Sequence, residues 1–122
     1  MLVVDDEESI RKVTGTVLMR HGYNVILAAD GAEALVAFVN DMTRIKAVIT
    51  DVMMPFIDGK VLVRALLSLN PEIKIIATTG HCAEARLAEL REIHVGPCLM
   101  KPFNIMSLLT TLHELLHPTA GR

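Results

Sequence analysis

Residues 48–59 read Val48-Ile-Thr-Asp51-Val-Met-Met-Pro55-Phe-Ile-Asp58-Gly59, and the rest of the chain is organised around them. An apolar run ends abruptly in the carboxylate of Asp51, and a Met-Met-Pro loop and an Asp-Gly turn follow it. Short apolar runs bounded by turn residues are typical of buried strands. The stretch therefore predicts a buried strand that delivers Asp51 to the edge of a sheet.

Apolar runs of strand length alternate with helical patterns along the rest of the chain. The predicted strands cover residues 1–5, 25–28, 47–50, 73–78 and 98–100, and the predicted helices cover 6–20, 32–40, 59–69, 83–94 and 105–116. Five strand–helix pairs in strict alternation indicate one parallel sheet with helices on both faces. The predicted fold class is therefore α/β, a doubly wound five-stranded parallel sheet, in which ligands bind beyond the carboxyl ends of the strands.

Four of the predicted helices carry apolar residues at helical spacing, which we expect to face the core. These residues are Ile10, Val13, Val17 and Leu18 in the first helix, Leu35, Phe38 and Val39 in the second, Val61, Leu62, Ala65 and Leu66 in the third, and Ile105, Leu108, Leu109, Leu112, Leu115 and Leu116 in the last. We expect Gly22 to end the first helix and Asn104 to cap the last one.

Length and composition bound the class of protein. A chain of 122 residues, of which 52% are hydrophobic, predicts a single domain over residues 1–122 with a well-filled core. The net charge of −2 and the lack of any Lys/Arg block argue against direct binding to nucleic acid.

The sequence also predicts no membrane contact and a cytoplasmic location. No apolar run approaches the roughly 20 residues that span a bilayer, and no basic region precedes a hydrophobic stretch as in a signal peptide. Cys82 and Cys98 form no spaced framework, so we expect both to be free thiols in a reducing compartment.

Polar residues follow four of the predicted strands at the point where each strand ends. Asp5 and Asp6 close the first strand, Asp51 the third, Thr79 the fourth and Lys101 the fifth. Carboxylates brought together repel each other and need a cation, and an all-oxygen ligand set suits Mg²⁺ (or Mn²⁺). A carboxylate nucleophile, a divalent metal, an ammonium group and a hydroxyl together indicate phosphoryl transfer onto an aspartate.

Each of these residues has an ordinary structural explanation when it is taken alone. Asp5 and Asp6 lie where acidic residues favour a helix N-terminus, and Asp51 could cap the next turn. Thr79 is a common strand residue and Lys101 a common loop residue. The joint pattern at one predicted sheet edge is what favours a functional site.

Four motifs resemble those of response regulator receiver domains of two-component signal transduction. They are Val3-Val-Asp-Asp-Glu7, Asp51-x-x-Met-Pro-x-x-Asp-Gly59, Ala77-Thr-Thr-Gly80 and Lys101-Pro-Phe103, in family order and spacing over essentially the whole chain. The resemblance implies the flavodoxin-like receiver fold with strand order 2-1-3-4-5. It also implies a Mg²⁺-dependent phosphorelay in which the domain catalyses only its own phosphorylation and dephosphorylation.

The resemblance assigns a role to each residue of the predicted site. Asp51 is expected to accept a phosphoryl group from a phosphohistidine of a sensor kinase. Asp6 and Asp51 are expected to hold the metal ion through their carboxylates, Met53 through its backbone carbonyl, and Asp5 through water. Thr79 is expected to follow the phosphoryl group as the switch hydroxyl and Lys101 to pair with it, with a cis peptide bond before Pro102.

The resemblance also implies partners, with one departure from the family pattern. The expected partners are a histidine kinase or phosphotransfer domain, and an output domain or second copy that binds the face made by residues 83–94, 98–100 and 105–116. Cys98 stands where the family commonly has Tyr or Phe, so the output signal either runs differently or the domain relays phosphate. The abrupt start at the first strand and the sequence of residues 75–81 resemble a receiver joined to a sensor kinase, as in a hybrid kinase, and a stand-alone receiver or a piece of a larger regulator is the alternative.

Three other interpretations compete with this one. His113-Glu-Leu-Leu-His117 matches the H-E-x-x-H motif of zinc proteases, but the leucine stripe turns Glu114 away from the core and no third ligand follows. An aspartate-dependent phosphatase resembles a D-x-D pattern, whereas position 53 is Met, so its general acid is missing. The third alternative is a doubly wound domain without retained chemistry.

Overall fold

The computed structural model describes residues 1–51, 59–79, 98–100 and 104–116. Within these residues the elements are, in chain order, β1 (Leu2–Val4), α1 (Glu8–Arg20), β2 (Ile26–Ala28), α2 (Gly31–Asn40), β3 (Ala47–Asp51), α3 (Gly59–Leu69), β4 (Lys74–Thr79), β5 (Cys98–Met100) and α5 (Ile105–Leu116). The predicted alternation of strands and helices is confirmed for these segments. The predicted helix over residues 83–94 lies outside the described residues.

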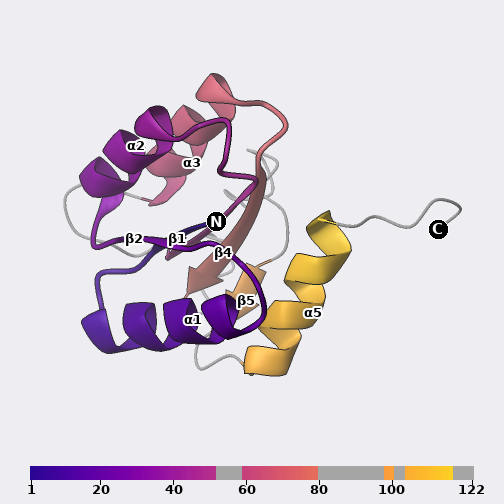
Figure 1. Ribbon diagram of the computed structural model, residues 1–122. Coiled ribbons are helices and arrows are strands. Elements are labelled where there is room, and N and C mark those ends of the chain that lie inside the picture. The colour runs from indigo at the N-terminus through magenta and orange to yellow at the C-terminus, as the bar shows by residue number, and fades with distance from the viewer. Residues whose placement is uncertain (52–58, 80–97, 101–103, 117–122) are drawn as a thin grey trace, which may run out of the picture.

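The strands form one parallel sheet in the order β2-β1-β3-β4-β5, as predicted. The register pairs Val4 with Thr50 between β1 and β3, and Asp51 with Thr78 between β3 and β4. Because all strands run the same way, their carboxyl ends meet at one edge of the sheet (Figure 1). The chain reverses its winding direction between β1 and β3, which places a topological switch point at that edge.

Two apolar clusters cover the two faces of the sheet. In Figure 1, α2 and α3 lie above the sheet and α1 and α5 lie below it. Successive residues of a strand point to opposite faces, so Leu2 and Val4 join the cluster under α2 and α3, while Val3 joins the cluster over α1 and α5. Strands covered on both sides in this way need nearly continuous apolar sequence, which is what residues 1–4 and 47–50 supply.

The helices bury a narrower stripe than the sequence predicted. Val13, Val39 and Val61 are 56%, 57% and 56% exposed, so their predicted burial is wrong. Each lies next to a fully or nearly buried residue of the same helix: Thr14, Phe38 and Leu62. Neighbouring residues are about 100° apart around a helix, and only one side of each helix meets the sheet.

Small residues set the side on which α1 packs. Its buried residues are Thr14, Gly15 and Leu18. A Cβ atom at Gly15 would lie 2.9 Å from Cδ2 of Leu27, which shows how closely the helix approaches β2. The helix side that carries small residues therefore faces the sheet, and the valine at position 13 faces outward.

The predicted end of the first helix and the predicted cap of the last helix are confirmed, whereas the first two helices begin at Glu8 and Gly31 instead of residues 6 and 32. His21 follows the last residue of α1, and Gly22 has a φ of 88°, a left-handed conformation that favours glycine. At the start of α5, the side-chain oxygen of Asn104 accepts a hydrogen bond of 2.7 Å from the backbone N–H of Met106.

The described helices are also short. The longest of them, α1, has 13 residues. Across the described ranges we find no helix with both the length and the apolar character needed to cross a membrane.

Candidate functional site

Three carboxylates meet at the carboxyl end of the sheet. Asp51 is the last residue of β3, and Asp5 and Asp6 directly follow β1, the strand beside it. One carboxylate oxygen from each of the three residues lies within 4.8 Å of the other two. Asp5 and Asp51 are each only 4% exposed, whereas Asp6 is exposed to solvent. The structure therefore brings together the three acidic residues that the sequence predicted for the metal site.

Asp5 is fixed by directed hydrogen bonds at three of its atoms. Its backbone N–H donates to the carbonyl of Ala28 in β2 at 3.2 Å. Its Oδ1 accepts a hydrogen bond of 2.9 Å from the N–H of Glu7. Its backbone carbonyl accepts a hydrogen bond of 2.7 Å from Nη1 of Arg11. Both the backbone and the side chain of Asp5 are thus held in one orientation.

The backbone of Asp51 is held by strand pairing and by the residue that precedes it. The strand pairs with β1 and β4, and Asp51 itself is in register with Thr78. The hydroxyl of Thr50 donates a hydrogen bond of 3.0 Å to the Asp51 carbonyl. Thr50 and Thr78 are both buried, so this end of the sheet is closed to water around the Asp51 backbone.

The charge and the donor set of this cluster fit a divalent cation. Three carboxylates within 4.8 Å of one another repel when they are ionised, and a cation between them removes that repulsion. All three donors are hard oxygen atoms, which favour Mg²⁺ or Mn²⁺ over softer metals. One exposed donor beside two buried ones leaves the site accessible from solvent.

Arg11 also belongs to this region, although no sequence motif pointed to it. Its guanidinium reaches back from α1 to the carbonyl of Asp5, six positions earlier in the chain. A signal was present, because positive side chains are disfavoured near the N-terminus of a helix, where the helix dipole is positive. An arginine that close to the start of α1 indicates a partner outside the helix.

The other predicted site residues are described in part or not at all. Thr79 is the last residue of β4, and its backbone is paired with Met100 of β5, but its side chain lies outside the described set. The same holds for the side chain of Cys98. Met53, Lys101 and the bond before Pro102 lie outside the described residues. Their roles stay predictions.

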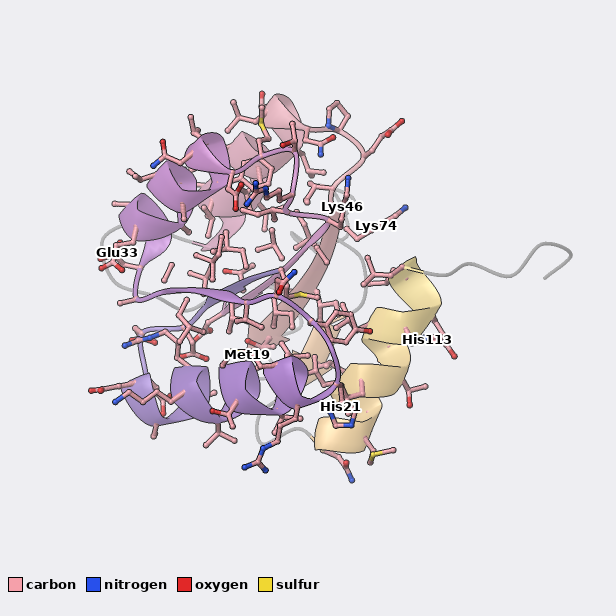
Figure 2. The ribbon with its side chains drawn as sticks, in the orientation of Figure 1. Met19, His21, Glu33, Lys46, Lys74 and His113 are labelled. Atoms are coloured by element: carbon pink, nitrogen blue, oxygen red, sulfur yellow. The ribbon has the colours of Figure 1, made fainter. Side chains whose placement is uncertain are left out.

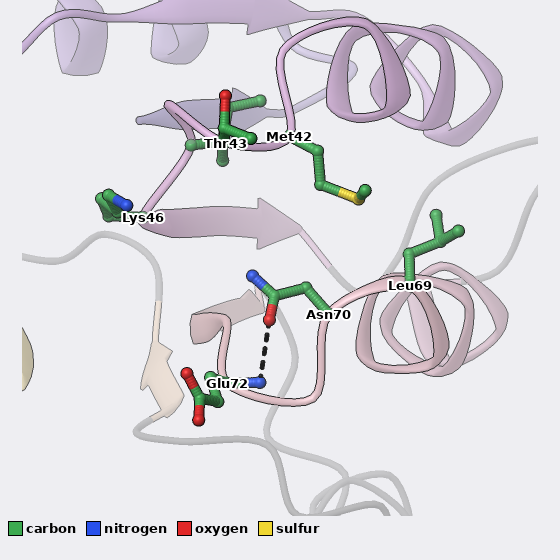
Figure 3. Close-up of a pocket in the computed structure, with 7 residues that line it drawn as sticks. Met42, Thr43, Lys46, Leu69, Asn70 and Glu72 are labelled. Atoms are coloured by element: carbon green, nitrogen blue, oxygen red, sulfur yellow. Dashed lines mark hydrogen bonds between the residues drawn. The ribbon is translucent and has the colours of Figure 1, made fainter.

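The opposite end of the sheet has a different character. The exposed side chains of Lys46 and Lys74 lie there (Figure 2). The backbone N–H of Lys74 donates a hydrogen bond of 3.4 Å to the carbonyl of Lys46. A cavity of about 410 Å³ opens beside Lys46 (Figure 3). Its lining residues are Met42, Thr43, Ile45, Lys46, Leu69, Asn70 and Glu72. This hollow lies at the amino ends of the strands, away from the three carboxylates.

The structure gives no support to a zinc site on the last helix. His113 and Glu114 are both exposed on α5, and His113 is labelled in Figure 2. His117 lies outside the described residues. Within the described part of the chain, the group of side chains close enough to share a metal is the aspartate cluster, which contains neither residue.

Comparison with known proteins identifies one family over nearly the whole chain. The family model described as response regulator receiver domain matches residues 1–113. The sensor kinase CckA of Brucella abortus is 35% identical over 116 residues, which are 95% of this chain and 12% of the kinase. The response regulator MprA of Mycobacterium sp. (strain KMS) is 35% identical over 120 residues, which are 98% of this chain and 51% of that protein.

A solved structure agrees with these matches. The chemotaxis protein CheY4 of Vibrio cholerae superposes with a TM-score of 0.86 and 34% identity, covering 93% of this chain and 95% of that one. The chain therefore spans 12% and about half of the two longer relatives, and nearly all of the chemotaxis protein.

Proposed function

The chain belongs to the response regulator receiver domains of two-component systems, and from this premise we propose that Asp51 accepts a phosphoryl group from a phosphohistidine of a sensor kinase. The observation that carries the proposal is the position of Asp51. Its carboxylate ends the central strand β3 at the carboxyl edge of the sheet, beside the carboxylates of Asp5 and Asp6. Family membership, the fold and this juxtaposition all support the same assignment.

The chemistry that we propose is one in-line displacement at phosphorus. A carboxylate oxygen of Asp51 attacks the phosphorus of the phosphohistidine and forms a P–O bond. The P–N bond breaks, its electron pair returns to the imidazole nitrogen, and that nitrogen takes up a proton. The product is an acyl phosphate on Asp51. The domain contributes mainly position and charge, because phosphoryl transfer needs little covalent help.

The acidic cluster is proposed to hold Mg²⁺ or Mn²⁺. Asp6 and Asp51 would bind the ion through carboxylates, Met53 through its backbone carbonyl, and Asp5 through water. When bound, the ion supplies positive charge that offsets the three carboxylates and the oxygens of the phosphoryl group. The burial of Asp5 and Asp51 strengthens that electrostatic contribution, since water screens charges less there.

Thr79 and Lys101 are proposed to complete the site. Thr79 ends β4, the strand beside β3, and would donate its hydroxyl to the phosphoryl group. Lys101 follows β5 directly in the sequence and would pair with the phosphoryl oxygens through its ammonium group. Thr79 and Met100, the residue that directly precedes Lys101, end their strands at the same sheet edge as Asp51, which supports the proposal.

The wider function follows the family. We propose one receiver domain over residues 1–122 that acts in the cytoplasm and catalyses only its own phosphorylation and dephosphorylation. Its partners are a histidine kinase or phosphotransfer domain, and an output domain or second copy that binds the face containing β5 and α5. With Cys98 in place of the usual aromatic residue, relay of the phosphoryl group is the favoured output. The match to part of a longer sensor kinase supports a relay role.

Phosphorylation by acetyl phosphate tests the central assignment. In the presence of Mg²⁺, the mass of the intact protein should increase by one phosphoryl group, and Asp51→Asn should abolish the increase. Asp41→Asn is the matched control, because Asp41 lies at the end of α2, outside the acidic cluster. Unchanged labelling of the Asp51→Asn variant contradicts the assignment. Steady turnover of phosphomonoesters would favour the phosphatase alternative instead.

A further inference from the structure

We propose that Arg11 is a positioning residue of the metal site and acts on Asp6 through the Asp5–Asp6 peptide bond. The inference rests on the metal site proposed above and adds to it a residue outside the acidic cluster. Its basis is the hydrogen bond of 2.7 Å that Nη1 of Arg11 donates to the backbone carbonyl of Asp5.

The carbonyl that Arg11 binds belongs to the peptide unit joining the two aspartates. A peptide unit is planar, so the carbonyl oxygen of Asp5 and the Cα atom of Asp6 lie in one rigid plane. When Arg11 holds that oxygen, it also sets the direction in which the chain leaves Asp5. The Cα atom from which the Asp6 carboxylate projects is therefore placed by a side chain of α1.

Asp6 needs such support more than the other two acids do. Asp51 is part of a strand that is paired on both sides, and Asp5 is held by Ala28 and Glu7 as well as by Arg11. Asp6 is exposed and lies between β1 and α1, outside both elements. Its place in the cluster depends on the backbone that precedes it.

An arginine suits this task for two reasons. A charged donor makes a stronger hydrogen bond to a carbonyl than a neutral donor does. Arg11 is also half-buried, so its side chain is restrained by its surroundings and keeps its orientation. Side chains just outside a metal's own ligands usually affect metal affinity by about 10-fold to 100-fold when they are removed.

Because Arg11 is positively charged, the direction of the change in metal affinity distinguishes two explanations of its role. If Arg11 acted only through its charge, its removal would strengthen the binding of a divalent cation, because one repelling cation would be lost. If Arg11 positions Asp6, its removal should weaken the binding. Geometry and charge thus predict opposite results for the same variant.

Mn²⁺ binding, followed by electron paramagnetic resonance of the free ion, measures this directly without phosphorylation. We expect Arg11→Met to weaken Mn²⁺ binding by about 10-fold. Arg11→Lys keeps the positive charge and an N–H donor group, so its affinity should lie between those of the wild type and Arg11→Met. Arg20→Met is the matched control, because Arg20 is exposed at the far end of the same helix. It should bind Mn²⁺ like the wild type.

The outcomes separate this inference from the function on which it rests. A wild-type protein that binds no Mn²⁺ refutes the proposed metal site and, with it, the role of Arg11. A wild-type protein that binds Mn²⁺ while Arg11→Met binds it equally well or more tightly refutes the role of Arg11 alone. Thermal unfolding in EDTA verifies that each variant is folded. If Arg11→Met does not fold, Arg11→Lys takes its place: weaker Mn²⁺ binding than the wild type supports the role of Arg11, and unchanged binding refutes it.

Discussion

The hydroxyl of Thr50 donates a hydrogen bond of 3.0 Å to the carbonyl of Asp51, and both residues are buried. This bond is side chain to backbone, so it supports the end of β3 without using the Asp51 carboxylate. A buried hydrogen bond of this kind contributes about 1 kcal/mol to stability. The strand end that carries the proposed phosphoacceptor is therefore stabilised by the residue just before it.

Replacement of Thr50 by valine tests that contribution. Thr50→Val keeps the shape of the side chain and removes the hydroxyl, so we expect a loss of about 1 kcal/mol in the free energy of unfolding, measured with urea. Thr110→Val on the exposed side of α5 is the control and should change stability by less than about 0.5 kcal/mol. Equal effects of the two substitutions would show that the bond adds nothing.

Neutralisation of Asp6 should have opposite effects with and without metal. In EDTA, Asp6→Asn should raise the melting temperature, because it removes one of three carboxylates that lie within 4.8 Å of each other. In Mg²⁺ at about ten times its dissociation constant, the wild type should gain roughly 1.4 kcal/mol, and the variant should gain much less.

A matched control separates local repulsion from net charge. Glu72→Gln makes the same change in charge at the amino end of β4, away from the cluster. It should leave the stabilisation by Mg²⁺ intact. If Asp6→Asn and Glu72→Gln respond alike to Mg²⁺, the ion does not bind at the acidic cluster.

The ion pair at the start of α1 makes a prediction about pH. The hydrogen bond of 2.6 Å from Nζ of Lys12, together with its charge, lowers the pKa of Glu8 below the ordinary value of 4.5. Because the pKa is lower in the folded state, the pair's contribution to stability is present above the unfolded pKa. It is lost as the pH falls through the folded pKa.

A carboxyl titration by nuclear magnetic resonance checks this assignment. The Glu8 midpoint should lie below 4.5 in the wild type and rise toward that value in Lys12→Met. Salt should also raise the midpoint, since both side chains are exposed and their attraction is screened. Arg20→Met, at the other end of α1, should leave it unchanged. A midpoint that does not move in Lys12→Met would rule out Lys12 as the main cause.

Substitution of Gly22, in the turn after α1, should destabilise the protein through backbone strain alone. Gly22 has a φ of 88°, and among the described residues, its chain neighbours aside, no atom lies within 4 Å of the position that a Cβ would occupy. Gly22→Ala should therefore cost about 1 kcal/mol through conformational strain and nothing through steric overlap. Gly22→Asn should cost less, since asparagine adopts this conformation more readily. Urea unfolding of the two variants measures the difference, and equal losses would argue against strain as the cause.

Lys101 is expected to act after phosphorylation and not in metal binding. Lys101→Ala should keep its affinity for Mn²⁺, whereas phosphorylation should no longer shift the amide resonances of residues outside the site. The comparison uses acetyl phosphate and the wild type as reference. Loss of Mn²⁺ binding in the variant would contradict the proposed role.

The sheet and the acidic cluster could be predicted because they depend on short-range patterns. The runs that end in Asp5 and Asp51 are apolar strands followed by carboxylates, and parallel strands place such ends together. The outward position of Val13 could not be predicted from periodicity, because the small side of α1 at Gly15 packs on β2 and turns Val13 away. Arg11 was missed because its partner lies outside its own helix, and helical periodicity does not describe such contacts.

The two apolar clusters meet along the strands that carry the acids. Val4 of β1 and Val48 of β3 belong to the cluster under α2 and α3. Their neighbours Val3 and Ile49 belong to the cluster over α1 and α5. Neither pair of helices can therefore detach without exposing these two strands. Amide hydrogens of β1 and β3 should therefore exchange with solvent only when the whole domain unfolds, while those near the helix ends exchange through local opening. Asp51 ends one of these strands and Asp5 follows the other, so we expect the buried half of the acidic site to open only when the whole domain unfolds.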